Sequence, residues 1–251
     1  MTVLDKRPGE DVPDRISRYS SYFMKQLNAI DAMTSSKDRD SAIMYKKSLY
    51  VCLLSALACG RYGKQQGKDR QHFLQLISDY SDWAERDRVS TVQLHYTLTK
   101  NKTLRAETPK SIMVLAGEKV REMQSGNVYP VPAVDDEIDF YSNLISSTSP
   151  KVKNLIFGSR MQALLYDYRC HLVHEFRSPG YGIEMTGDGE RAYYHSYINR
   201  KPGWELVFPL GLFKQICKSC VENLHRYYLA EGINPYGRYR FSSLWSDKFK
   251  T

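Results

Sequence analysis

The sequence has no long hydrophobic run. Its most apolar stretch, LYVCLLSALACG over residues 49–60, is much shorter than the roughly 20 residues that span a bilayer. The opening MTVLDKRPGEDVPDR is polar and has no apolar signal region. We therefore expect no membrane association and no export signal, and hence a cytoplasmic protein. Five cysteines are an odd number, which fits reduced thiols in that compartment.

Several chemical motifs are also missing. The sequence has no glycine-rich phosphate loop, no zinc-ligand spacing and no internal repeat. The CKSC segment, Cys217 to Cys220, has redox spacing, but both sulfurs fall on the apolar face of the predicted last helix, which favours core cysteines. The acidic run Asp135–Asp139 could bind a divalent cation, although carboxylates in the first turn of a helix are the favoured interpretation. We predict neither a metal nor a cofactor.

The isolated histidines do not change this prediction. Packing in the core or at the surface explains each of them at least as well as metal ligation does: His72, His95, His195 and His225.

The chain is basic. It has 251 residues, of which 42% are hydrophobic and 25% charged, ordinary values for a globular protein long enough for one substantial domain. The net charge of +8 is less ordinary and favours a polyanionic partner such as nucleic acid.

Hydrophobic periodicity predicts a mainly α fold. Helices are expected over residues 14–30, 39–59, 68–85, 90–98, 108–124, 159–175 and 210–230, with another from about residue 135. Residues 125–136 are predicted to be loop, and residues 181–209 to be a β-meander of three short strands inserted before the last helix. We expect a flexible tail over 1–13, one helical domain over 14–233 and a C-terminal tail over 234–251.

The C-terminal tail alternates cations with aromatic residues. Such alternation suits single-stranded nucleic acid, because cations meet phosphates and rings meet bases. Arg238, Tyr239 and Arg240 are its candidate RNA-binding residues. In the alternative interpretation, the rings pack on the core and the charges are solvated.

The most informative segment is DYRCHLVHEFRSPG, Asp167 to Gly180, which follows a buried helical stripe. Arg169 flanks that stripe, whereas Cys170 and His174, four residues apart, share the opposite face. Arg169 and His174 are five residues apart and would point about 140° apart on an α-helix. Both long side chains could still reach one phosphate in a groove that crosses the helix.

The order Arg169, four residues, His174 near the end of a late helix resembles the signature of the HEPN superfamily (higher eukaryotes and prokaryotes nucleotide-binding domains). Its members are helical bundles with an Arg-x4–6-His motif, and many are metal-independent endoribonucleases of toxin–antitoxin, CRISPR and phage-defence systems. Cys170 departs from the commonest form, which has Asn, Asp or His there. Phe176 replaces the tyrosine that one toxin group presents for nucleotidylation, so that regulation is not implied.

The resemblance implies RNA as substrate, a homodimer with a composite site, and an antitoxin or defence-system partner protein. His174 would act as acid or base and Arg169 would hold the phosphate, which gives a 2′,3′-cyclic phosphate product. His171 is a candidate catalytic proton shuttle, and Arg177 a candidate RNA-backbone contact.

Three other interpretations stay open. The chain could be a non-catalytic HEPN-like subunit that binds nucleic acid or a partner protein. Arg169 could pair with Asp167 or Glu175 as a purely structural feature, with the two histidines as helix-end cations. Cys170 could instead be a nucleophile activated by His174.

Overall fold

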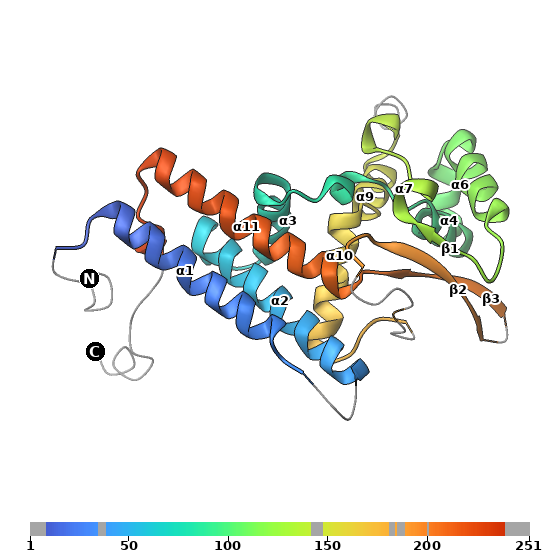
Figure 1. Cartoon of the computed structure of the whole chain (residues 1–251). Helices are drawn as coiled ribbons and strands as arrows, with labels where there is room; N and C mark the ends of the chain where they lie inside the picture. The colour runs from blue at the N-terminus through green and yellow to red at the C-terminus, as the bar shows by residue number, and fades with distance from the viewer. Residues whose placement is uncertain are drawn as a thin grey trace, which may run out of the picture. The chain divides into compact units, whose positions relative to one another are not determined.

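The computed structural model describes residues 9–34, 39–141, 148–180, 184, 189–199 and 201–238 (Figure 1). These residues form a mainly helical protein with a small antiparallel sheet, as the sequence predicts. Where we expect one helical domain, the chain divides into two compact units. Unit 1 comprises Met1–Thr34, Leu49–Asp82 and Ile216–Thr251, and unit 2 comprises Ser35–Ser48 and Trp83–Gln215.

Unit 1 is helical in the part that the structure describes. It contains α1 (Val12–Asp31), most of α2 (Arg39–Tyr62), α3 (Asp69–Tyr80), most of α11 (Leu210–Glu231) and the short 3-10 helix η3 (Pro235–Arg238). The helices α1, α2 and α11 lie side by side (Figure 1). The rings of Tyr19 and Tyr228 meet edge to face at 5.8 Å, and the Cys217 thiol donates to the Tyr50 carbonyl at 3.5 Å.

Several helix ends differ from the expected positions, and the helix expected over residues 68–85 ends at Tyr80. The first helix begins at Val12, before Asp14, because the Asp11 side chain caps it by accepting from the Asp14 amide at 2.9 Å. The helix α2 continues through Gly60, the expected stop, to Tyr62. Gly63, with φ of +84°, follows that end, and its amide donates to the Cys59 carbonyl.

The CKSC cysteines belong to the core, as predicted. Cys217 and Cys220 are fully buried on α11, and burial raises the pKa of both thiols well above the usual value. All five cysteines are free. A buried thiol with a raised pKa is a poor nucleophile, so this pair does not form a redox site.

One apolar segment is longer than the sequence prediction assumed. Ser41–Tyr62 of α2 is a 22-residue stretch long and apolar enough to cross a membrane. In the most apolar part of this stretch, 44% of the residues are buried inside the protein. A buried core helix meets the same criteria, so the segment by itself is weak evidence for a membrane.

Unit 2 combines short helices with the sheet. Its further helical elements are η1 (Ala84–Asp87), α4 (Thr91–Lys100), α5 (Lys102–Glu107), α6 (Lys110–Glu122), α7 (Val131–Val134), residues 138–141, α9 (Pro150–Gly158), α10 (Met161–Cys170) and η2 (His171–Glu175). The first residues of α2 and α11 also belong to it.

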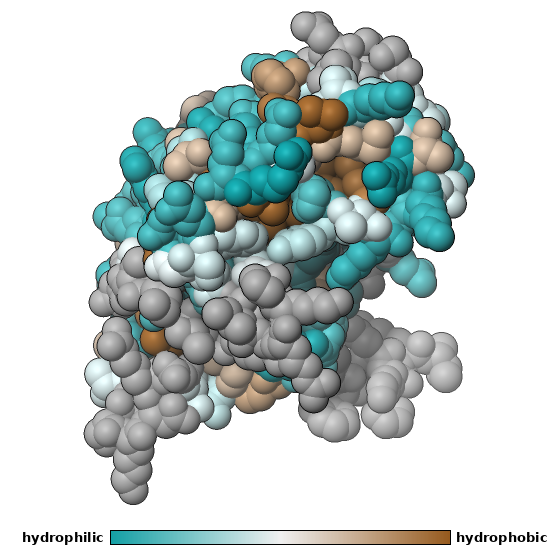
Figure 2. All heavy atoms as spheres, turned by 90° about the vertical axis from the view of Figure 1, so that its right-hand side faces the viewer, coloured by the Kyte–Doolittle hydropathy of each residue, from teal (hydrophilic) through white to brown (hydrophobic). Residues whose placement is uncertain are grey.

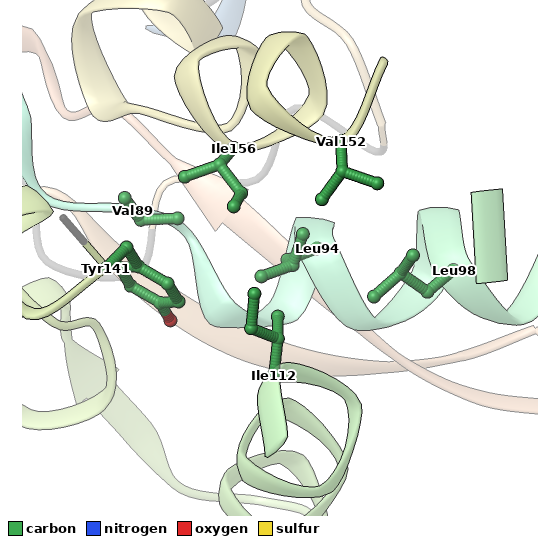
Figure 3. Close-up of a cluster of buried hydrophobic side chains, with 7 residues drawn as sticks. All are labelled: Val89, Leu94, Leu98, Ile112, Tyr141, Val152 and Ile156. Atoms are coloured by element: carbon green, nitrogen blue, oxygen red, sulfur yellow. The ribbon is translucent and has the colours of Figure 1, made fainter. Parts of the chain in front are cut away.

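Side chains from α4, α6 and α9 point toward one another in the core of unit 2 (Figure 3). This cluster consists of Val89, Leu94, Leu98, Ile112, Tyr141, Val152 and Ile156, each less than 5% exposed.

The sheet is not the predicted three-strand meander. Its strands are β1 (Val128–Pro130), β2 (Tyr193–Asn199) and β3 (Lys201–Val207), in the order β1-β2-β3. The hairpin of β2 and β3 precedes the last helix as expected, but the third strand comes from a segment predicted to be loop. Only three residues pair there, and Pro130 is tolerated because β1 is an edge strand. Residues 181–183 and 185–188, where a first strand was expected, lie outside the described residues.

The acidic run that follows α7 has a structural role different from the expected one. Asp135 does not sit in the first turn of its own helix but at the N-terminus of α4, where Oδ1 accepts from the Thr91 amide at 2.8 Å. Its Oδ2 accepts from the Tyr194 hydroxyl at 2.6 Å, and Asp136 pairs with Lys119 at 2.6 Å. Among the described residues, no group of three or more His, Cys, Asp or Glu could hold a metal ion.

The buried carboxyl of Asp135 should make folding sensitive to pH. Burial raises its pKa to about 7, against the hydrogen bonds from Tyr194 and Thr91 and the charge of Lys119. Between about pH 4 and 7 the folded state keeps a proton that the unfolded chain releases, so this contribution to stability is lost as pH rises through that window. We expect urea unfolding to show a larger loss between pH 5 and 8 for the wild type than for Asp135→Asn. Equal losses would contradict this.

Candidate functional site

The motif helix α10 is fixed by its apolar side. The predicted stripe is confirmed, because all four of its residues are at most 7% exposed: Met161, Leu165, Tyr168 and Leu172. The Tyr168 ring meets Phe208 edge to face at 5.6 Å and Phe213 at 5.8 Å. Burying these side chains leaves Asp167 exposed and Arg169 half-buried toward the end of the helix, whereas Gln162 in its first turn is buried.

The first turn of α10 is held by polar contacts. The Met161 amide donates to the Arg88 carbonyl at 2.9 Å. The Asp87 carboxylate accepts from the side-chain amide of Gln162 at 2.6 Å and from the Arg160 guanidinium at 3.1 Å. These contacts fix where the helix starts, and therefore where its far end emerges.

A buried ion pair lies beside the same helix. The Lys47 ammonium is 2.7 Å from the Glu184 carboxylate, with both side chains 3% exposed. The other Glu184 oxygen accepts from the Leu210 amide at the start of α11, at 2.7 Å. Lys47 also lies 5.6 Å from the centres of the Tyr168 and Phe213 rings. The pair thus joins α2, α10 and α11 within unit 2.

The end of the motif helix has an unusual backbone. Residues His171–Glu175 form a π-helical turn, in which the Phe176 amide donates to the His171 carbonyl five residues earlier. Phe176 itself is left-handed, with φ of 54°, a conformation uncommon for a non-glycine residue. Its exposed ring packs against Tyr45 at 5.6 Å. Such turns occur frequently at functional sites.

The π turn brings the two signature residues together. Arg169 Nη1 lies 3.4 Å from His174 Nε2 on the exposed side of the turn. A guanidinium has only donors, so this contact is a hydrogen bond in the tautomer whose Nε2 is free to accept. The ends of the two long side chains thus reach one point, as the sequence prediction allowed, although that prediction assumed an α-helix throughout and the helix changes to a π turn at His171. The His174 imidazole contacts Arg169. A nucleophile–base pair would instead need it to contact Cys170.

His171 and Arg177, the other two candidate residues of the motif segment, share a different partner. Glu175 Oε1 lies 2.8 Å from His171 Nδ1, and Oε2 forms an ion pair with Arg177. Desolvation raises the pKa of Glu175, but the hydrogen bonds and charges of Arg177 and then His171 together outweigh it and lower that pKa below its usual value. His171 and Arg177 are thus joined to each other through Glu175, which sequence reasoning considered only as a partner of Arg169.

A groove of about 440 Å³ runs beside α10. Asp167 and His171 line it, together with Gln93, Leu164, Tyr168, Pro179, Gly180, Trp204, Glu205, Leu206 and Phe208. Gly180, with φ of +70°, allows the Glu205 carboxylate to approach so closely that no Cβ would fit. Glu205 also lies 3.7 Å from His195 on the neighbouring strand. Sequence spacing gave no sign of this groove, because its walls come from four distant segments.

The candidate residues of the C-terminal tail are only partly described. Arg238 Nη1 donates to the Tyr62 carbonyl at the end of α2, at 3.2 Å, and Tyr236 lies under the Arg18 guanidinium at 4.6 Å. Both contacts agree with a tail that packs on unit 1. Tyr239 and Arg240 lie outside the described residues.

The chain matches no protein-family model, no curated protein and no solved structure. The resemblance to the HEPN superfamily therefore depends on the motif alone.

Leu172 should hold the π turn against the core, since it is the fully buried residue of that turn. We expect Leu172→Ala to lower the free energy of unfolding by about 2–5 kcal/mol. Val173→Ala, a change beside it at a half-buried position, should cost about 1 kcal/mol or less. Denaturant unfolding of the two variants tests this. Equal losses would show that the turn does not depend on Leu172.

Proposed function

We propose that this chain is a metal-independent endoribonuclease of HEPN type, with Arg169 and His174 at its catalytic centre. The observation that carries the proposal is the 3.4 Å contact between Arg169 and His174 on an exposed turn. A phosphate cleft needs a cation and a proton-transfer group within reach of one phosphate. The net charge of +8 favours a nucleic-acid ligand.

The reaction follows from these two side chains. His174 Nε2 takes the proton of an RNA 2′-hydroxyl, whose oxygen then attacks the adjacent phosphorus. The new 2′-oxygen–phosphorus bond closes a 2′,3′-cyclic phosphate, and the bond to the 5′-oxygen breaks. Arg169 leaves the imidazole to donate to the non-bridging oxygens, where negative charge accumulates. DNA, which has no 2′-hydroxyl, is not a substrate.

The leaving 5′-oxygen also needs a proton. In the proposed homodimer, a second copy of His174 across a two-fold axis supplies it, so two motif turns form one composite site. His171 is held by Glu175 and is the alternative donor within the same chain. We place the activity in phage defence or a toxin–antitoxin or stress system, with a partner protein that controls it.

Cleavage should depend on His174 and Arg169. We expect His174→Ala to lower the cleavage rate by about 10²–10⁴-fold, with little change in RNA affinity. Arg169→Lys keeps the charge but loses the planar fork, so it should also be strongly impaired. The assay is labelled RNA in EDTA, with analysis of the product ends for 2′,3′-cyclic phosphate.

His225→Ala, the same change on α11, is the matched control and should cut at the wild-type rate. A folded His174→Ala protein that also cuts at the wild-type rate would end this assignment. If the wild type binds RNA and does not cut it, the non-catalytic binding subunit replaces the nuclease.

Glu175 should restrain RNA binding, because its carboxylate repels phosphate and pairs with Arg177. We expect Glu175→Gln to tighten RNA binding by roughly threefold or more at low salt. The stability change should be small, since the Glu175 side chain is 44% exposed. Glu222→Gln, at an exposed glutamate of α11 that pairs with Lys218, controls for the charge change. Equal affinities of the two variants would contradict this role.

A further inference from the structure

A second hollow lies in unit 2, away from the motif turn, between α4, α5 and α6. It is lined by His95, Leu98, Thr99, Arg105, Lys110, Met113, Val114, Gly117 and Arg121, and its volume of about 430 Å³ is in the range of small-ligand pockets. None of its residues belongs to the motif or to the groove beside α10. Whatever it binds is therefore independent of the proposed nuclease site.

The wall of the hollow carries positive charge without a matching carboxylate. Arg105, Lys110 and Arg121 line it, and among the described residues no acidic side chain does. Elsewhere in unit 2, cations face carboxylates, as Lys119 does with Asp136. Arg121 instead donates to the Gly117 carbonyl at 3.0 Å, which holds its side chain back along α6. Three cations that share one hollow repel one another, and an anion placed between them relieves that repulsion.

The floor of the hollow is apolar. Leu98 is a core residue, Met113 packs against the same core, and Val114 is 52% exposed. Figure 2 shows exposed hydrophobic atoms between hydrophilic ones on the side of the molecule that carries α6. A small inorganic anion would leave this floor uncovered, whereas a flat apolar ring attached to the anion would cover it.

Gly117 keeps the floor open. A Cβ there would make ordinary van der Waals contact with the Arg121 guanidinium at 3.6 Å and the His95 ring at 3.7 Å, so a larger side chain at this lining position would take up space in the hollow. Glycine in a helix interior lowers the free energy of unfolding by about 0.5–1 kcal/mol relative to alanine. The open space at Gly117 is therefore accompanied by a loss of stability. Burial, and then the charge of Arg121, lower the pKa of His95. A neutral imidazole can both donate and accept hydrogen bonds with a polar ring.

We propose that this hollow, defined by Arg105, Lys110, Arg121 and Gly117, binds a nucleotide. The three cations contact its phosphates, and the base lies on the floor formed by Leu98, Met113 and Val114. The proposal does not depend on the endoribonuclease activity, because it uses none of the same residues.

Calorimetric titration of the purified full-length chain with ATP and AMP tests this. We expect saturable binding at one site per chain, with ATP tighter because it presents more phosphate oxygens. The double variant Arg105→Gln, Arg121→Gln should bind ATP at least roughly tenfold more weakly. The double variant Lys25→Gln, Lys68→Gln removes two exposed cations from unit 1 and should bind like the wild type.

The variant Gly117→Leu tests the contribution of the floor independently of the charges, because it fills the hollow and removes no cation. We expect it to weaken ATP and AMP binding at least roughly tenfold, with circular dichroism confirming that the variant is folded. Should this variant alone unfold, Val114→Thr replaces it, because it makes the exposed edge of the floor polar without changing the charge, and a weaker binding of both nucleotides is again expected.

Two further probes decide between ligands. Inorganic pyrophosphate should bind more weakly than ATP; equal affinity, unaffected by Gly117→Leu, would overturn the nucleotide. The second probe is a short single-stranded RNA, titrated into the His174→Ala variant so that it is not cleaved. If the RNA binds through Arg105 and Arg121 and ATP does not bind, the occupant of the hollow is RNA and the nucleotide proposal is overturned. Failure of both nucleotides to bind at millimolar concentration would also overturn the proposal.

Discussion

On an α-helix, residues five positions apart point about 140° apart, so Arg169 and His174 would start from different sides of the helix. The π-helical turn over His171–Glu175 changes this, because each turn takes in one more residue and the fifth position returns to the same side. The 3.4 Å contact between the two side chains and the left-handed exit at Phe176 accompany that backbone. The proposed chemistry depends on it as well.

The turn keeps this geometry because its surroundings are rigid. Leu172 is buried within it, and Tyr168 one turn earlier packs between Phe208 and Phe213. At the other end of α10, Asp87 holds Arg160 and Gln162. The polar side chains of the motif contribute little to this anchoring, so their substitution should test chemistry and not folding.

The positively charged side chains of unit 2 have two different kinds of surroundings. At the motif turn, a carboxylate accompanies the cations, and Glu175 compensates Arg177 and His171. In the hollow between α4 and α6, the cations line an apolar floor without an acidic residue among the lining. The first arrangement suits a site in which groups exchange partners when substrate arrives, and the second suits a site that gains its compensating charge from the ligand.

Local periodicity along the chain was enough to predict the helical class, the buried stripe of α10, the core position of Cys217 and Cys220, and the hairpin before the last helix. The shared position of Lys110, Gly117 and Arg121 beside one hollow was not predicted, because α4 and α5 supply its other walls. Other features depend on contacts between segments far apart in the sequence. The strand Val128–Pro130 exists because β2 offers it a partner, and Asp135 caps a helix far from it in sequence. The π turn gives no periodic signal, since one extra residue alters hydrogen bonding only where packing and the exit at Phe176 allow it.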